Sequence, residues 1–142
     1  MYILYKKTLF WLYKDSRLVE EHTMNTLQKI GYWKKMLELE AWSIKAEKIS
    51  RFAVYDEEKD RRNIEYVGVD INRYAKRAVI LHTRKLTHED ICHELLHIAC
   101  PNYNEDEINT LMIECLAISS QIKHDLEALQ SIQNSISFLY GE

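Results

Sequence analysis

The segment that decides the fold is residues 87–100, which read THEDICHELLHIAC. Thr87 and Asp90 stand three positions apart at its start and fit a capping box, in which each side chain bonds the other residue's backbone N–H. Acidic residues in the first turn also suit the helix dipole. Pro101 follows and cannot continue a helix. The sequence therefore predicts a helix that begins after Thr87 and ends before Pro101.

This helix carries a His-Glu-x-x-His pattern at His93, Glu94 and His97. Residues four apart lie on one helix face, so the two imidazoles can bind one tetrahedral metal ion. Glu94 lies about a quarter-turn round the helix, where it can deprotonate a metal-bound water. A pattern this short also occurs by chance, and two surface or core histidines remain the alternative reading.

Three short segments upstream have the pattern of strands: the first two alternate apolar and polar residues, and the third is a continuous apolar run. They lie at residues 49–55, 67–71 and 78–81, and the charged run 56–62 predicts a hairpin turn after the first. We therefore expect a three-stranded antiparallel meander ahead of the histidine helix.

Helical patterns flank this region on both sides. Residues 2–47 repeat apolar residues at three- and four-residue spacing, with a break expected at Gly31. A further helix is expected to begin near Asn104. Its apolar stripe consists of Ile108, Leu111, Met112, Cys115, Ile118 and Ile122. The fold class is therefore α+β.

The expected organisation is one domain over residues 1–142: a helical part (1–48), the sheet and histidine site (49–118) and a helical tail (119–142). In the tail, apolar residues recur at heptad spacing, namely Ile122, Leu129 and Ile136, with Ile132 and Leu139. We expect this seam to pack on the N-terminal helices. A homodimer through the C-terminal helix is the alternative use.

Composition narrows the function classes. A net charge of -3 over 142 residues gives no case for a broad nucleic-acid footprint. Three cysteines, Cys92, Cys100 and Cys115, cannot all pair within one chain, which favours reduced thiols in a cytoplasmic protein. Lysines interrupt the apolar patches at the start, so neither a leader nor a membrane span is expected.

Two stretches resemble a known group of enzymes. RAVILHTRKLTHEDICHELLH, residues 77–97, resembles the strand, loop and helix of small gluzincin zinc metallopeptidases. EDEINTLMIECL, residues 105–116, resembles the downstream glutamate helix of the ImmA/IrrE-type family, and it is similar to that of short phage metallopeptidases and archaeal minigluzincins. The resemblance covers residues 77 to about 118. It implies a zinc ion held by both histidines and a glutamate of the second helix.

Carried over residue by residue, the resemblance makes His93 and His97 zinc ligands and Glu94 the general base. Glu105 becomes the third ligand, because Ile108 and Asn109 then fall on the family's Ala and Asn/Asp positions. Asn109 would support that ligand. Seven residues separate His97 from Glu105, fewer than in the family, and Ile108 replaces a small residue. Glu107 is the reserve third ligand, and Glu114 ranks below it.

The function that this implies is a zinc-dependent metallopeptidase, in which Glu94 acts as general base on a zinc-bound water. A peptide or protein substrate could extend along the strand at residues 79–82. Tyr103 could donate a hydrogen bond to the reaction intermediate, and His82 or His88 could reach substrate. The alternatives are a catalytically weak, zinc-stabilised binding or regulatory module and a helical interaction protein without metal.

Overall fold

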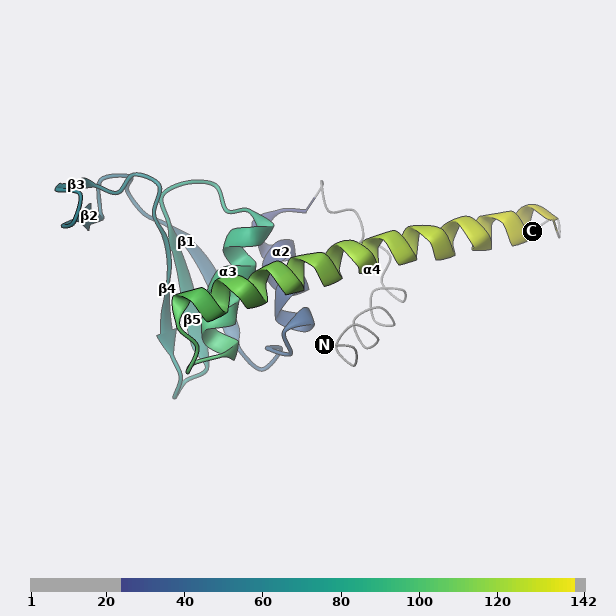
Figure 1. Cartoon of the computed structure of the whole chain (residues 1–142), viewed down its shortest axis with the longest axis horizontal. Helices are drawn as coiled ribbons and strands as arrows, with labels where there is room; N and C mark the ends of the chain where they lie inside the picture. The colour runs from purple at the N-terminus through teal and green to yellow at the C-terminus, as the bar shows by residue number, and fades with distance from the viewer. Residues whose placement is uncertain (1–23, 140–142) are drawn as a thin grey trace.

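The computed structural model describes residues 24–139, which form a three-stranded sheet with helices packed on one face (Figure 1). The elements are α2 (Thr26–Met36), β1 (Ser43–Lys48), β2 (Tyr55–Asp56), β3 (Arg61–Arg62), β4 (Val67–Asn72), β5 (Arg77–His82), α3 (His88–Ala99) and α4 (Glu105–Leu139). The expected mixture of helices and one small sheet is confirmed, while its layout differs from the expectation.

The sheet has the strand order β1-β5-β4, so that β5 is central. β4 runs antiparallel to β5 with Val69 opposite Ile80, as expected for these two segments. β1 runs parallel to β5 with Ala46 opposite Ile80. The predicted all-antiparallel meander is therefore wrong. The chain returns through β4 before it forms β5, and this return lets β5 run parallel to β1.

The first strand was expected at residues 49–55, yet β1 lies earlier in the chain. Residues 55–56 instead pair with residues 61–62 as a two-stranded ribbon, β2 with β3, outside the main sheet. The hairpin expected over residues 56–62 is present in this ribbon. Asp60 takes a left-handed conformation within it, with φ of 48°. The charged run thus turns the chain without adding a strand to the sheet.

The helix predicted over residues 2–47 is wrong from Leu37 onward, and its residues 2–23 lie outside the described residues. α2 begins at a capping box of Asn25 with Gln28. Gly31 lies inside α2 and does not break it. The helix ends because Glu38 adopts a left-handed φ of 57°, the conformation that commonly closes a helix.

α2 anchors the two helices behind the sheet. The Trp33 side chain is fully buried, and its Nε1 donates a hydrogen bond of 3.0 Å to Nδ1 of His88 at the start of α3. The hydroxyl of Tyr32 hydrogen-bonds that of Ser119 on α4. Two aromatic side chains of α2, each with one polar atom, thus hold α2 against both α3 and α4.

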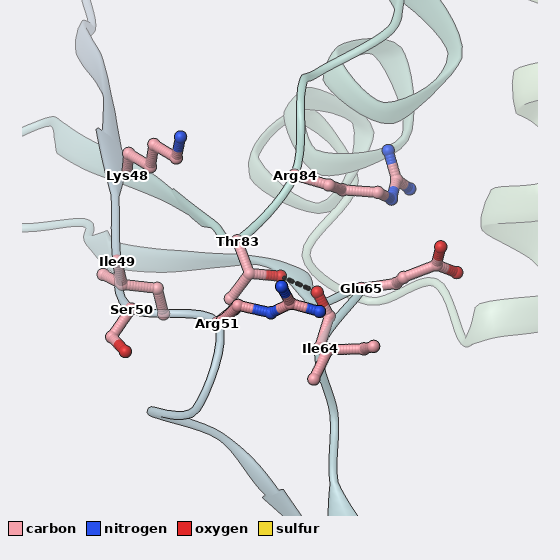
Figure 2. Close-up of a pocket in the computed structure, with 8 residues that line it drawn as sticks. All are labelled: Lys48, Ile49, Ser50, Arg51, Ile64, Glu65, Thr83 and Arg84. Carbon is pink, nitrogen blue, oxygen red and sulfur yellow. Dashed lines mark hydrogen bonds between the residues drawn. The ribbon is translucent and has the colours of Figure 1, made fainter.

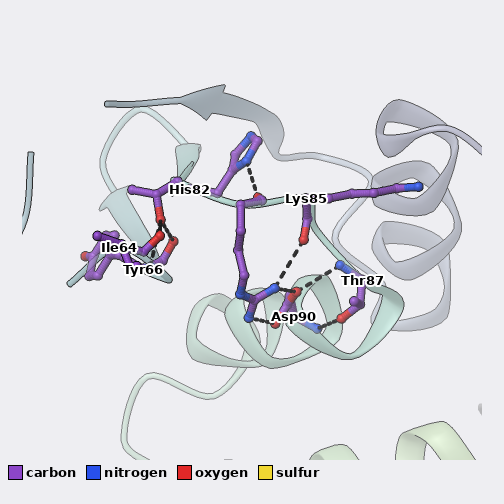
Figure 3. A network of polar contacts seen from close by, with 8 residues as sticks. Ile64, Tyr66, His82, Lys85, Thr87 and Asp90 are labelled. Carbon is purple, nitrogen blue, oxygen red and sulfur yellow. Dashed lines mark hydrogen bonds and ion pairs between the residues drawn. The ribbon is translucent and has the colours of Figure 1, made fainter. Parts of the chain in front are cut away.

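α3 begins with the predicted capping box of Thr87 and Asp90. Arg84 binds the same carboxylate with two bonds, Nη1 to Oδ2 at 2.6 Å and Nη2 to Oδ1 at 2.8 Å (Figure 3). Burial raises the pKa of Asp90, but the hydrogen bonds from Arg84 and Thr87 outweigh it, so the net pKa lies below its ordinary value. Asp90 therefore stays ionised and holds the helix start on the β5–α3 connection.

One face of α3 supplies the centre of the core. Its buried residues are Ile91, Cys92, Glu94, Leu95, Leu96 and Ile98. They pack against buried residues of the other elements, which include Trp33, Met36, Ile80, Ile108 and Ile122. The histidines at positions 93 and 97 fall on the neighbouring, half-buried side of α3. Because core packing fixes the rotation of α3 about its axis, it also fixes the direction in which the side with both histidines faces.

α4 joins the expected glutamate helix and tail into one continuous helix, which extends well past the sheet (Figure 1). The expected seam is covered only in part. Ile122 and Leu126 are buried, whereas Leu129, Ile132, Ile136 and Leu139 are exposed. Of the N-terminal part expected to cover the seam, residues 1–23 lie outside the described residues. The homodimer contact stays a prediction.

The cysteines are unpaired. Cys92 and Cys115 meet in the interface of α3 and α4, where a thiol–thiol hydrogen bond and burial raise the pKa of Cys92. Cys92 is thus a neutral packing group, and it does not line the cavity that the two histidines line. Within residues 24–139, no helix combines the length and apolar character that a membrane span requires.

The core position of α3 predicts a large cost for truncation there. Leu95→Ala should lower the free energy of unfolding by about 2–5 kcal/mol, because Leu95 is fully buried. Leu27 on α2 provides the control because it is 73% exposed. Leu27→Ala should change the free energy of unfolding by less than about 0.5 kcal/mol. Urea denaturation measures both. Equal losses in the two variants would contradict this packing.

Candidate metal centre

The two motif histidines lie together on α3, one turn apart. Their rings are 4.9 Å apart between centroids, and their Nε2 atoms are 3.2 Å apart. Both side chains are partly buried, with 20% exposure at His93 and 25% at His97. As predicted, His93 and His97 lie on one face of the helix, and both Nε2 atoms point to the same place.

Glu105 meets the histidines from the first residue of α4. Its Oε2 lies 3.2 Å from Nε2 of His93, and its Oε1 lies 2.8 Å from Nε2 of His97. One potential ligand atom from each of the three residues falls within 4.8 Å of the others. Two imidazoles and a carboxylate form the donor set of many catalytic zinc sites, which keep a fourth position open for water. The three residues can therefore hold a metal ion.

Glu107 does not reach this cluster because it is used in the cap of α4. Its Oε1 accepts the backbone N–H of Asn104 at 3.2 Å, and its own N–H donates to Oδ1 of Asn104 at 2.9 Å. This reciprocal pair is a capping box. Glu114 and Asn109 are exposed further along α4. The structure thus brings Glu105, and not the reserve candidates, to the histidines.

Glu94 lies beside the cluster and is not part of it. Its side chain is only 7% exposed, in contrast to the 65% exposed carboxylate of Glu105. Burial, together with the negative charges of Glu105 and Asp90, raises the pKa of Glu94 to about 7. A carboxyl group with a pKa near neutrality can both accept and return a proton, as a general base requires.

A cavity of about 500 Å³ opens in front of these residues, between β4 and the helices. We call it the β4 groove, and it is lined by Val67, Gly68, Val69, Ile71, Arg73, His93, Glu94, His97, Pro101 and Glu105. β4 is an edge strand of the sheet. The prediction that a peptide docks along residues 79–82 is wrong, because these residues belong to β5, which is paired on both sides and has no open edge.

The other candidate residues lie away from the cluster. Tyr103 is 47% exposed in the turn before α4, and its N–H donates to the carbonyl of Cys100. His82 contacts the carbonyl of Arg84 through Nδ1 at 2.8 Å, and His88 accepts from Trp33. None of these three residues lines the β4 groove.

A second cavity of about 500 Å³ lies where β1 and β5 end (Figure 2), and it is lined by Lys48, Ile49, Ser50, Arg51, Ile64, Glu65, Thr83 and Arg84. It shares no lining residue with the β4 groove. The Thr83 hydroxyl donates to the carbonyl of Ile64 at 2.7 Å, and the Arg84 guanidinium is bound to Asp90. Thr83 therefore ties the end of β5 to the segment before β4, and Arg84 ties the β5–α3 connection to the start of α3.

Sequence reasoning missed two residues that shape the site. Asn104 caps α4, and the spacing of Asn104 to Glu107 is a capping signal that could have been recognised. Arg73, in the turn after β4, donates from its two terminal nitrogens to the carbonyls of His97 and Ile98, each at 3.0 Å. No local pattern predicts a contact between a side chain and carbonyls so distant in the sequence.

Comparison with protein-family models, with curated proteins and with solved structures finds no match to this chain.

The two glutamates at the start of α4 should separate in a zinc titration. Glu105→Ala should weaken zinc affinity by about tenfold or more, because it removes the carboxylate that lies against both histidines. Glu107→Ala should leave the affinity nearly unchanged and lower the free energy of unfolding by about 1 kcal/mol, because it removes half of a capping box. Competition with a chromophoric chelator measures the affinities. The reverse order would contradict the assignment.

Proposed function

We propose that the chain is a zinc-dependent metallopeptidase that hydrolyses peptide bonds, with His93, His97 and Glu105 as zinc ligands. The observation that carries the proposal is the position of the Glu105 carboxylate, which lies against the Nε2 atoms of both histidines although it comes from another helix. The three side chains thus bring two imidazole nitrogens and a carboxylate together at the wall of the β4 groove.

A zinc ion held there would supply a Lewis acid that polarises the scissile carbonyl and lowers the pKa of water toward about 7. Glu94 stands one residue from a ligand and lines the same groove. Its carboxylate could take a proton from the attacking water and return it to the leaving amine.

β4 supports the choice of a peptide substrate. An edge strand presents unpaired backbone N–H and C=O groups along its open side, and an extended peptide can add to it as another strand. β4 carries Val67, Val69 and Ile71 into the groove that also holds the ligand histidines. A peptide along this edge would pass its backbone in front of Glu94. This replaces the central strand β5 as the proposed docking strand.

A zinc-stabilised binding or regulatory module is the second candidate function. The observation in its favour is that the three ligands come from consecutive helices, with His93 and His97 on α3 and Glu105 on α4. A metal ion at this place would tie the two helices together and stabilise the fold even without catalysis. Hydrolysis of unstructured peptides separates this candidate from the first. The cytoplasmic location and the absence of a nucleic-acid partner stay predictions.

Elemental analysis should find one zinc ion per chain in protein purified without chelators. His93→Ala and His97→Ala should each lose it, because each removes one of the two imidazole ligands. His124→Ala is the matched control, since His124 is exposed on α4 and should keep full zinc content. Wild-type protein free of zinc after such a purification would sink the proposal.

Glu94→Gln should keep zinc and lose peptide hydrolysis by about 10²–10⁴-fold, because the amide has the shape of the carboxylate but cannot accept the proton. Cleavage of a fluorogenic unstructured peptide measures the rate. Glu107→Gln serves as the control and should keep both zinc and activity, since Glu107 belongs to the α4 cap. If Glu94→Gln loses its zinc, Glu94 is a ligand and its proposed role is wrong.

A further inference from the structure

The end of α3 leaves a backbone carbonyl without its usual partner. In a helix, the carbonyl of residue 97 bonds the N–H of residue 101, but that residue is Pro101, which has none. The last N–H of the helix cap, that of Cys100, donates to the carbonyl of Leu96. The carbonyls left over in this last turn include that of His97, one of the two histidines of the cluster.

Arg73 supplies the missing donors. Its Nη2 donates to the carbonyl of His97 and its Nη1 to that of Ile98, each at 3.0 Å. A planar guanidinium can bond two neighbouring acceptors at once, and a cation is favoured at the carboxyl end of a helix. The β4–β5 turn is therefore tied to the last turn of α3 through a single side chain.

Both ends of this tie belong to the β4 groove. Arg73 directly follows β4, the edge strand that forms one wall, and it lines the groove with His93, His97 and Glu105. The carbonyl that it binds is on the same residue as the imidazole that faces Glu105. A shift of the α3 end would therefore change the distance between Nε2 of His97 and the Glu105 carboxylate, now 2.8 Å.

We propose that Arg73 is a positioning residue that holds the end of α3, and with it the His97 imidazole, at the separation from Glu105 that a zinc ion requires. This inference rests on the proposed function for the identity of the metal. The hydrogen bonds that carry it are independent of that function, so the two can fail separately.

The variants are Arg73→Ala, which removes the guanidinium, and Arg73→Lys, which keeps the charge without the planar fork. Arg77→Ala is the control, because it removes the same charge from an exposed position at the start of β5. Arg73→Ala should weaken zinc affinity by about 10–100-fold, as loss of a group that orients a ligand does. Arg73→Lys should fall between, and Arg77→Ala should match the wild type.

Two further measurements show how Arg73 acts. The visible absorption of bound Co²⁺, which depends on ligand geometry, should change in Arg73→Ala and not in Arg77→Ala. Amide hydrogen exchange over residues 97–105, followed with chelator present, should be faster in Arg73→Ala than in Arg77→Ala. The exchange arm needs no metal, so it tests the tie even if wild-type protein binds no zinc.

Equal exchange in the two alanine variants would overturn the inference, whatever the zinc result. Faster exchange with unchanged zinc affinity would also overturn it, because the tie would then not act on the ligand. If Arg73→Ala does not fold, the decision passes to Arg73→Lys, whose zinc affinity must fall below that of Arg77→Ala. Wild-type protein without zinc affinity would refute the proposed function, and with it the role of Arg73 toward the metal.

Discussion

The short connection between α3 and α4 is the constraint on which the site depends. Seven residues separate His97 from Glu105, and within them the chain must leave one helix and start another. Pro101 stops α3, the N–H of Tyr103 donates to the carbonyl of Cys100 at 3.2 Å, and Asn104 caps α4. The first residue of α4 thereby comes back alongside the last turn of α3.

The two acidic residues of the site differ in environment, and this difference divides their roles. Glu94 is buried on the core side of α3, which raises its pKa to about 7. Glu105 is 65% exposed and lies against the imidazoles of His93 and His97. Pairs of carboxyl groups held in unlike surroundings commonly take unlike chemical roles. Helix packing sets this contrast in burial, because the core-facing side of α3 includes Glu94.

The sequence predicted the elements that have strong local signals and missed the one that has none. α3, β4, β5 and the start of α4 were predicted from a capping box, alternation and apolar spacing. β1 was missed because SIKAEK has helix-forming Ala, Glu and Lys and only one fully buried residue, Ile44. Its strand conformation comes from pairing with β5, which no local pattern reveals. The strand order, and with it the open edge at β4, could not be predicted because it depends on the place of β1 in the sheet.

Within the site, the sequence supplied the residues but not the reason for the choice among them. Glu105 and Glu107 lie at similar angles from the apolar stripe, so helical geometry did not separate them. The structure separates them through Asn104, whose cap uses the side chain of Glu107 and leaves that of Glu105 for the histidines. Arg73 could not be predicted at all, because its acceptors are backbone carbonyls, and a carbonyl has no identity in a sequence. Because Pro101 cannot supply the N–H that would bond the His97 carbonyl, the helix end needs a donor from elsewhere in the fold, and only the three-dimensional arrangement identifies it as Arg73.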